Sequence, residues 1–386
     1  MRKLIQVVDN WLGERLPMTS IKEFLHKQSS KPLPPHTSWF HTFGSLSLFL
    51  IANQIITGIL LMIYYRPTVD NAFESINFIT TKATFGWLIR GLHAWGATLM
   101  IIMVLLHMVR TFFMGAFKKP REMTWVIGVF LFGITLTFGF TGYLLPWNQL
   151  SYWATTVGTE ITGSIPVMGE FVKRLLLGGD VIGGETLARF YVMHVIVLPW
   201  VLVFLVTIHI VLMRAQGLAT LDRVGEEIKP DGKNGLPFFP HHVLKELVLF
   251  CIFFAFMLTL IVLWSVELGE KADPFTTPAV IKPEWYFLST YQLLKYFPKL
   301  IGLFISVIPP LLLLLWPFLD RTSERRFSKR PFSVTLGIAA IVLAVVMGVL
   351  GYFSEREITF FGKKYHIDHY GIPRDIETTV EGKDKK

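Results

Sequence analysis

The sequence predicts an all-α integral membrane protein, and three observations lead to this fold class. Of the 386 residues, 52% are hydrophobic and only 17% are charged, whereas a soluble domain carries about 25% charged residues. The mean hydropathy is +0.50. Apolar runs close to the roughly 20 residues that a helix needs to cross a bilayer recur along the chain. These properties exclude a soluble globular protein.

Seven of these runs predict transmembrane helices, at about 39–65, 87–115, 124–145, 187–214, 243–265, 300–319 and 332–353. A polar stretch at 221–237, LDRVGEEIKPDGKNGLP, is the best internal boundary. We therefore expect a four-helix bundle over 1–215, a linker over 216–240 and a three-helix domain over 241–386, which ends in an extramembrane tail at 354–386.

The distribution of basic residues predicts the orientation of the chain. One group of regions comprises the N-terminal segment and the second, fourth and sixth connections between spans, with the adjoining helix ends; it holds 20 Lys and Arg residues. The other three connections, with their adjoining helix ends, hold 10. The positive-inside rule then places the N-terminus in the cytoplasm and the tail outside. The N-terminal segment is amphipathic and is expected to lie along the membrane surface. Because the formal charge of +9 comes from loops between spans, it does not indicate binding of nucleic acid.

Two pairs of histidines lie inside predicted spans at similar spacings. His93 and His107 are fourteen residues apart, and His194 and His209 are fifteen apart. Fourteen residues advance a helix by about 21 Å and return to within about 40° of the starting direction. Each helix can therefore present two imidazoles on one face. An ionisable side chain inside a membrane is costly and is a functional hypothesis by default.

The two histidine-bearing helices begin on the same side, so we expect His93 to pair with His194 near the outer surface and His107 with His209 near the inner one. Glycines repeat at the same interval on the neighbouring helices, as Gly44 and Gly58 and as Gly128 and Gly142. Because glycine lets a bulky group approach the backbone, these helices can accommodate the edges of a flat macrocycle. Two haems, each ligated by two histidines, fit this pattern.

Other interpretations remain open at this point. Membrane histidines also form interhelical hydrogen bonds, and small residues in spans also serve helix packing. A transporter that uses intramembrane histidines as proton relays would need no haem. Arg90 and Arg189, outward of the outer histidines, and Arg110, which follows His107, are candidates to pair with haem propionates or to anchor helices at the interface. The single cysteine, Cys251, excludes an intrachain disulfide and a cysteine-ligated iron–sulfur cluster.

Two long outer connections carry the motifs that indicate a family. The motifs are PEWYFLSTYQLL at 283–294 and GYLLPWNQLSYW at 142–153. Together with the four histidines, the paired glycines and TLARFY at 186–191, they resemble cytochrome b of cytochrome bc complexes over about residues 30–355. PPHTSWFHTFG at 34–44, YYRPTVD at 64–70 and LMRAQG at 212–217 resemble the photosynthetic bf branch, and FFPHHVLKELV at 238–248 resembles the respiratory branch. Thr42 stands where the bf branch has a cysteine for an extra haem, so a covalent third haem is not expected.

The resemblance implies a haem- and quinone-binding subunit of a quinol:cytochrome c-type oxidoreductase in a bacterial inner membrane. Quinol would be oxidised at an outer site with electron bifurcation, one electron going to a Rieske iron–sulfur protein and the other crossing through two b haems to an inner quinone site. Partners would be a c-type cytochrome, the Rieske protein, lipid and a second copy of the chain. An alternative is a dihaem membrane anchor that relays electrons between quinone and a dehydrogenase.

The same resemblance assigns roles to individual residues. Glu284 is the candidate proton acceptor of the outer site, because quinol oxidation releases protons. Tyr143 and Tyr286 are expected to act beside it, with Tyr291 binding or shaping the site. Arg214 and Glu246 are the candidates for the inner quinone site, and Glu246 forms a lysine–acid pair with the preceding Lys245 there.

Overall fold

The computed structural model describes residues 2–376 except 31, 34–36, 220–222 and 226–235. Among these residues, seven segments are long and apolar enough to cross a membrane, which confirms the predicted fold class. They are built on α3 (Phe43–Met62), α5 (Gly86–Phe113), α6 (Glu122–Leu144), the continuous α9 (Gly184–Val192), η2 (Met193–Val197) and α10 (Leu198–Gln216), α11 (Val243–Leu263), α13 (Lys299–Leu319) and α14 (Pro331–Phe353).

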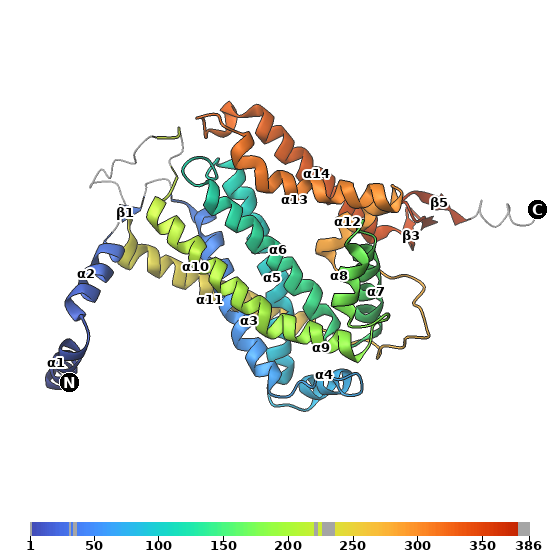
Figure 1. Cartoon of the computed structure of the whole chain (residues 1–386), viewed down its shortest axis with the longest axis horizontal. Coiled ribbons are helices and arrows are strands. Elements are labelled where there is room, and N and C mark those ends of the chain that lie inside the picture. Colours follow the sequence, from blue (N-terminus) through green and yellow to red (C-terminus); the bar gives the residue numbers. More distant parts are fainter. Residues whose placement is uncertain (1, 31, 34–36, 220–222, 226–235, 377–386) are drawn as a thin grey trace, which may run out of the picture.

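The spans form one helical assembly in which the two predicted halves are packed together (Figure 1). Within the first half, α3 packs against α5 and α10 packs against α6. From the second half, α11 lies against α5 and α3, while α13 lies against α6. The division at 216–240 stays a prediction, and most of the linker falls outside the described residues.

Polar side chains join α3 to α5 beside the first histidine. Asn53 Nδ2 donates to the carbonyl of Leu92 at 3.0 Å, and Gln54 Nε2 donates to the carbonyl of His93 at 3.0 Å. A Cβ at Gly96 would lie 2.3 Å from Gln54 Nε2, so only glycine leaves room for these amides. Such interhelical hydrogen bonds satisfy polar groups that the membrane cannot solvate.

A buried ionic cluster joins the two halves at the end of the assembly that we predict to be cytoplasmic and call the inner end. Lys118 Nζ donates to Asp320 Oδ1 at 2.6 Å, and both side chains are buried. The guanidinium of Arg330 donates to the carbonyls of Phe112 and Phe113, the last residues of α5. A cation is favourable at this point because the C-terminus of a helix carries unpaired carbonyls and partial negative charge.

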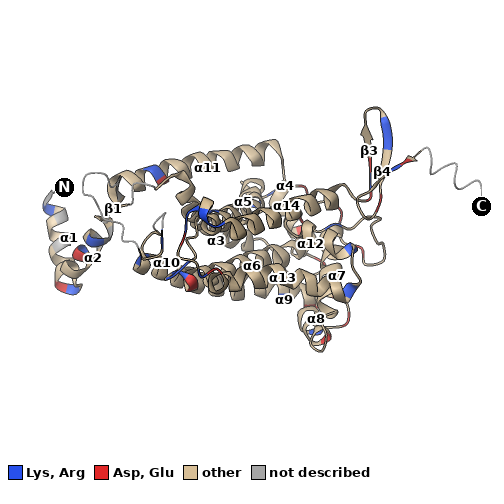
Figure 2. Ribbon diagram, turned by 90° about the horizontal axis from the view of Figure 1, so that it is seen from above, with Lys and Arg blue, Asp and Glu red and all other residues tan. Residues whose placement is uncertain are grey.

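Short elements gather at the two ends of the assembly. Figure 2 shows α1 (Arg2–Arg15) and α2 (Met18–Ser29) at one end, which is the end that we predict to be cytoplasmic. A short antiparallel pair, β1 (Pro32–Leu33) with β2 (Leu236–Pro237), links this segment to η3 (Phe238–His242) before α11. Helix α1 exposes Leu4, Val8 and Trp11; its position on a membrane surface stays a prediction.

The opposite end, which we call the outer end, carries the structured connections. These are α4 (Ala72–Thr81), the packed helices α7 (Gln149–Gly163) and α8 (Gly169–Leu177), and α12 (Trp285–Lys295). The tail forms an antiparallel sheet in the order β3 (Arg356–Phe360), β4 (Lys363–Ile367) and β5 (Pro373–Asp375). The sequence predicts an extramembrane tail here, but it does not predict these strands.

Candidate functional site

The four histidines come together as two pairs in the centre of the four-helix bundle. The ring centroids of His93 and His194 are 6.3 Å apart, and those of His107 and His209 are 6.4 Å apart. Two metal–imidazole bonds of about 2 Å, with about 1.1 Å from each nitrogen to its ring centre, put the centroids of two axial ligands about 6.2 Å apart. Each pair therefore has the spacing that one haem iron between two imidazoles requires.

A local change of helix type explains the unequal spacing of the two pairs. His194 lies in η2, a π-helical turn between α9 and α10. A π-turn holds one more residue than an α-turn, and such turns are frequent at functional sites. It absorbs the fifteenth residue between His194 and His209, so that both histidines still face their partners on α5.

The four glycines lie against the histidine rings themselves. A Cβ at Gly58 would lie 3.4 Å from His93 Cε1, and one at Gly128 would lie 3.4 Å from His209 Cε1. The corresponding distances are 3.2 Å from Gly44 to His107 Cε1 and 2.6 Å from Gly142 to His194 Cε1. That these glycines accommodate the edges of a macrocycle stays a prediction. In the structure each of them faces one imidazole.

Two threonines outside the predicted site contact the imidazoles of the outer pair. Thr57 Oγ1 lies 3.0 Å from His93 Nδ1 and donates its own proton to the carbonyl of Asn53 at 2.6 Å. Thr141 Oγ1 lies 3.1 Å from His194 Nδ1 and donates to the carbonyl of Thr137. With their protons used, both hydroxyls accept from Nδ1–H. This network fixes the tautomer in which Nε2 is free to bind a metal.

The three candidate arginines occupy different environments. Arg110 Nε is buried without a hydrogen-bond partner among the described residues, one helical turn from His107, which suits a carboxylate from a bound group. The guanidinium of Arg90 instead donates to the carbonyls of Val266 and Glu267, at 2.7 and 3.0 Å. Arg189 donates to the carbonyl of Leu175 at the end of α8. Arg90 and Arg189 therefore stabilise outer connections by hydrogen bonds to backbone carbonyls. A propionate would have to replace these carbonyls to bind either arginine.

The outer loop places Glu284 beside two tyrosines. Glu284 is the residue before the first turn of α12 and is half-buried. Tyr286 packs against α6, where a Cβ at Gly139 would lie 2.7 Å from its hydroxyl. Tyr143 is one turn further along α6 and interacts electrostatically with both groups. Burial raises the pKa of Glu284, against the opposing effect of the Trp285 N–H, and burial with the charge of Glu284 raises that of Tyr286.

Tyr291 lies on one side of a small hollow at the outer end. Its hydroxyl donates to the carbonyl of Ile281 at 3.0 Å, and Lys295 Nζ lies 4.6 Å from its ring centroid. The hollow has a volume of about 220 Å³ and is bordered by α7, α12 and α13, with Leu294 and Leu303 in its lining. The hollow is lined by Tyr291 and not by Glu284, Tyr143 or Tyr286. A carboxyl group of raised pKa beside half-buried tyrosines, as at Glu284, can receive a proton from a phenolic substrate.

At the inner end, a histidine connects the two predicted residues. The guanidinium of Arg214 lies over the ring of Phe238, with 5.0 Å to the centroid. The rings of Phe238 and His242 are 5.8 Å apart, and His242 Nε2 lies 3.3 Å from Glu246 Oε1. The structure thus places His242, which is not among the predicted site residues, between Arg214 and Glu246. Thr42 is 2% exposed and donates to the carbonyl of Trp39.

Comparison with known proteins gives the family. The description "Cytochrome b/b6/petB" matches residues 28–217, and "Cytochrome b(C-terminal)/b6/petD" matches residues 271–367. A cytochrome bc complex cytochrome b subunit of Chlorobaculum thiosulfatiphilum is 40% identical over 346 residues, which are 88% of this chain and 79% of that protein. The chain belongs to the cytochrome b family.

Other relatives come from both branches that the motifs suggested. Cytochrome b6 of Synechococcus sp. (strain JA-3-3Ab) is 44% identical over 212 residues, 55% of this chain and 97% of that protein. Cytochrome b of Rickettsia conorii is 37% identical over 370 residues, 93% and 91% of the two chains. A chain of a hyperthermophilic respiratory complex III superposes with a TM-score of 0.82 at 32% identity, over 89% of this chain and 91% of that one.

These findings confirm the predicted family and the predicted all-α membrane fold. The protein is an integral, multi-pass cytochrome b subunit of a bc- or bf-type quinol oxidoreductase complex, and the family implies b-type haem. The ligand assignments, the quinone sites and the orientation in the membrane stay predictions.

Proposed function

We propose that this cytochrome b holds two b-type haems, His93 with His194 and His107 with His209, and carries electrons from an outer quinol-oxidation site to an inner quinone site. The observation that supports this most is the pair of imidazole separations, 6.3 and 6.4 Å, on two parallel helices. Iron bound by two histidines has no open position, so the haems would supply one-electron transfer rather than oxygen binding.

The chain's own residues have separate tasks in this proposal. Gly44, Gly58, Gly128 and Gly142 leave space for the imidazoles, and Arg110 pairs with a propionate. At the outer site Glu284 accepts one of the two protons that quinol loses as it gives up two electrons. Its raised pKa makes the carboxylate a stronger base, while Tyr143, Tyr286 and Tyr291 bind or orient the substrate. At the inner site Arg214, His242 and Glu246 would contact quinone and supply protons.

The proposal requires partners, because bifurcation needs a second one-electron acceptor. The chain has one cysteine and therefore no motif for an iron–sulfur cluster or a c-type haem. A Rieske iron–sulfur protein would take one electron at the outer end and pass it to a c-type cytochrome. We further propose a homodimeric complex in a bacterial inner membrane, with the N-terminus cytoplasmic and no haem covalently attached at Thr42.

The test uses the intact complex purified from membranes. We expect two haems per chain in a pyridine haemochrome assay, and quinol oxidation coupled to reduction of a c-type cytochrome. With an inner-site inhibitor present, quinol should still reduce the b haems. A dihaem anchor serving a dehydrogenase would instead be indicated if the haems equilibrated with quinone but no electrons reached an iron–sulfur partner. A denaturing gel stained for haem peroxidase should show no band at this chain's mass.

A further inference from the structure

Helix α12, which begins just after Glu284, is packed closely on the outer end of α14. A Cβ at Gly351 would lie 2.9 Å from Leu288 Cγ, so only glycine allows the two helices to approach this far. Ser289 Oγ also donates to the carbonyl of Ala344 at 2.7 Å. The position of the Glu284 loop therefore depends on the segment that ends α14.

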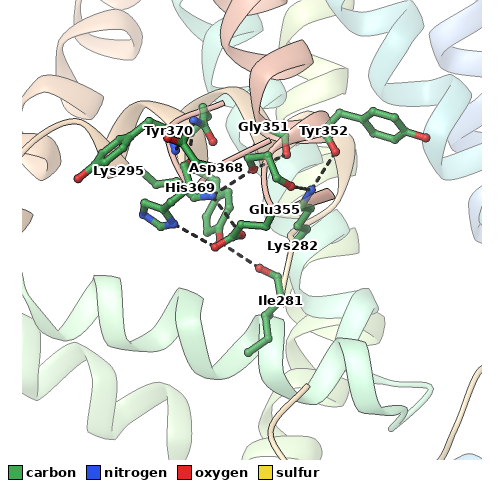
Figure 3. A network of polar contacts seen from close by, with 12 residues as sticks. Ile281, Lys282, Lys295, Gly351, Tyr352, Glu355, Asp368, His369 and Tyr370 are labelled. Atoms are coloured by element: carbon green, nitrogen blue, oxygen red, sulfur yellow. Dashed lines mark hydrogen bonds and ion pairs between the residues drawn. The ribbon is translucent and has the colours of Figure 1, made fainter. Parts of the chain in front are cut away.

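Lys282 fixes the start of this loop to the end of α14. It lies two residues before Glu284, and its Nζ donates to the carbonyl of Tyr352 at 2.8 Å and to that of Ser354 (Figure 3). The last carbonyls of a helix lack intrahelical partners and favour a cation. The ammonium group of Lys282 thus caps α14 with the loop that carries Glu284.

Lys295 fixes the other end of α12 to the same segment. Its side chain is 5% exposed, and its Nζ donates to Ser354 Oγ at 3.2 Å and to Glu355 Oε2 at 3.5 Å. The second carboxylate oxygen of Glu355 accepts from His369 Nδ1 at 3.0 Å. Figure 3 shows these side chains converging from α12, the end of α14 and the tail.

Glu355 joins this network to the tail sheet. Its backbone has a φ of +57°, which is uncommon for a residue with a side chain and persists where the surroundings determine it. Its N–H donates to the carbonyl of Ile367, the last residue of β4, at 2.8 Å. Burial alone would raise the pKa of Glu355, but His369 and Lys295 lower it overall, so the carboxylate is charged at neutral pH.

We propose that residues 352–355 at the end of α14, which Glu355 joins to the C-terminal sheet, are a positioning element for the outer quinol site, and that they act on the Glu284 loop through Lys282 and Lys295. The inference rests on the proposed role of Glu284. Because Glu284 immediately precedes α12, a shift of that helix moves its carboxyl group directly. A misplacement of about 1 Å can cost about a hundredfold in rate.

The test compares four variants in the intact complex: Lys282→Met, Lys282→Arg, Glu355→Gln and, as a control, Lys271→Met. Lys271 lies in the same connection and on the same side, in an exposed pair with Glu74 at 3.4 Å. For each variant we would measure haem content, kcat and KM with the quinol extracted from the native membranes, and the pH profile of b-haem reduction with an inner-site inhibitor present.

In Lys282→Met we expect normal haem content, a kcat lowered by about ten- to a hundredfold and a nearly unchanged KM. The midpoint of the pH profile should move down, because release of the loop reduces the burial that raises the pKa of Glu284 beside Tyr143 and Tyr286. Lys282→Arg should restore the rate, since it keeps a donor for the two carbonyls. Glu355→Gln should show a smaller loss, and Lys271→Met should match the wild type.

Wild-type kcat, KM and pH midpoint in both Lys282→Met and Glu355→Gln would overturn the positioning role. An equal loss in Lys271→Met would overturn it too, because net charge would then be the cause. If Lys282→Met does not assemble, Glu355→Gln decides by the same criteria. A wild-type complex that does not oxidise quinol would instead refute the proposed function, which separates the two failures.

Discussion

In the outer histidine pair each imidazole Nδ1 faces a threonine hydroxyl, whereas the inner pair has no such residue at the equivalent positions. Thr57 and Thr141 directly precede Gly58 and Gly142, but Phe43 and Ile127 precede Gly44 and Gly128. The centroid separations nevertheless agree within 0.1 Å, at 6.3 and 6.4 Å. The separation of the imidazole rings therefore depends on the helices and glycines. The hydrogen bonds to the imidazole Nδ1 atoms, in contrast, differ between the two pairs.

The surroundings of the two pairs differ as well. The outer pair lies towards Glu284 and the packed connections, and its neighbouring arginine Arg90 is already engaged by backbone carbonyls. The inner pair lies beside Arg110, whose Nε is buried without a hydrogen-bond partner among the described residues. Two sites of equal geometry can thus provide haems of different electronic character, which directed electron transfer across a membrane requires.

The largest expected effect is the loss of a haem. His93→Ala or His194→Ala should remove the outer haem alone, and His107→Ala or His209→Ala the inner one, because each iron would lose one of its two protein ligands. Pyridine haemochrome analysis should give half the wild-type haem per chain, and redox titration should show which component is missing. Full haem content in any of the four variants would refute the pairing.

Removal of the outer base should have the next largest effect. Glu284→Gln keeps the shape of the side chain but cannot accept a proton, so turnover should fall by about 10²–10⁴. The carboxylate is the active form and burial raises its pKa. Wild-type activity should therefore rise with pH through this raised pKa, and the rise should be absent in the variant.

The inner carboxylate supplies the matched control for this experiment. With an inner-site inhibitor present, Glu246→Gln should leave reduction of the b haems by quinol at the wild-type rate, because it acts only at the other end. If Glu284→Gln also kept the wild-type rate and pH profile, Glu284 would be structural, and Tyr143 or bound water would be the next candidate for the proton.

The two glycines of the outer pair should differ from each other, with a smaller effect. A Cβ at Gly142 would lie 2.6 Å from the ring of His194, whereas one at Gly58 would lie 3.4 Å from that of His93, an ordinary contact. Gly142→Ala should displace His194 and lower or alter the outer haem, while Gly58→Ala should keep it. Haem content and the low-spin electron paramagnetic resonance spectrum would distinguish them. Equal spectra in the two variants would contradict this order.

Much of this arrangement follows from local sequence, and the rest depends on distant contacts. Hydrophobic runs predicted all seven spans, and the interval of fourteen gave His93 and His107 a common face. The fifteen-residue interval between His194 and His209 indicated a π-turn, because fifteen residues of α-helix place two side chains on a common face less closely than fourteen do. By contrast, the carbonyls that engage Arg90 are 176 and 177 residues away, and no local pattern reports them.

The contacts of the C-terminal tail could not be predicted from local sequence either. Lys282, Lys295 and Glu355 are ordinary interfacial charges when the sequence is considered alone. Their convergence depends on the packing of α12 on α14 and on the left-handed backbone at Glu355. Thr57 and Thr141 lie between these extremes, because a threonine before each outer glycine is visible in the sequence but its role requires the imidazole beside it.

The smallest expected effect tests the hydrogen bonds that distinguish the outer pair. A hydrogen bond from Nδ1–H makes an imidazole a more basic ligand, and a more basic ligand stabilises oxidised iron. Thr57→Val and Thr141→Val keep the shape of the side chain but remove the acceptor, so each should raise the midpoint potential of the outer haem. One hydrogen bond contributes about 0.5–1 kcal/mol, which corresponds to a shift on the order of 20–40 mV for one electron. The inner haem should keep its potential, because neither threonine contacts His107 or His209.

Potentiometric titration of both haems in each variant would measure this difference, and Ile127→Val, at the equivalent inner position, is the matched control. An unchanged outer potential, or an equal shift of both haems, would mean that the threonines only pack and that the difference between the two sites has another source.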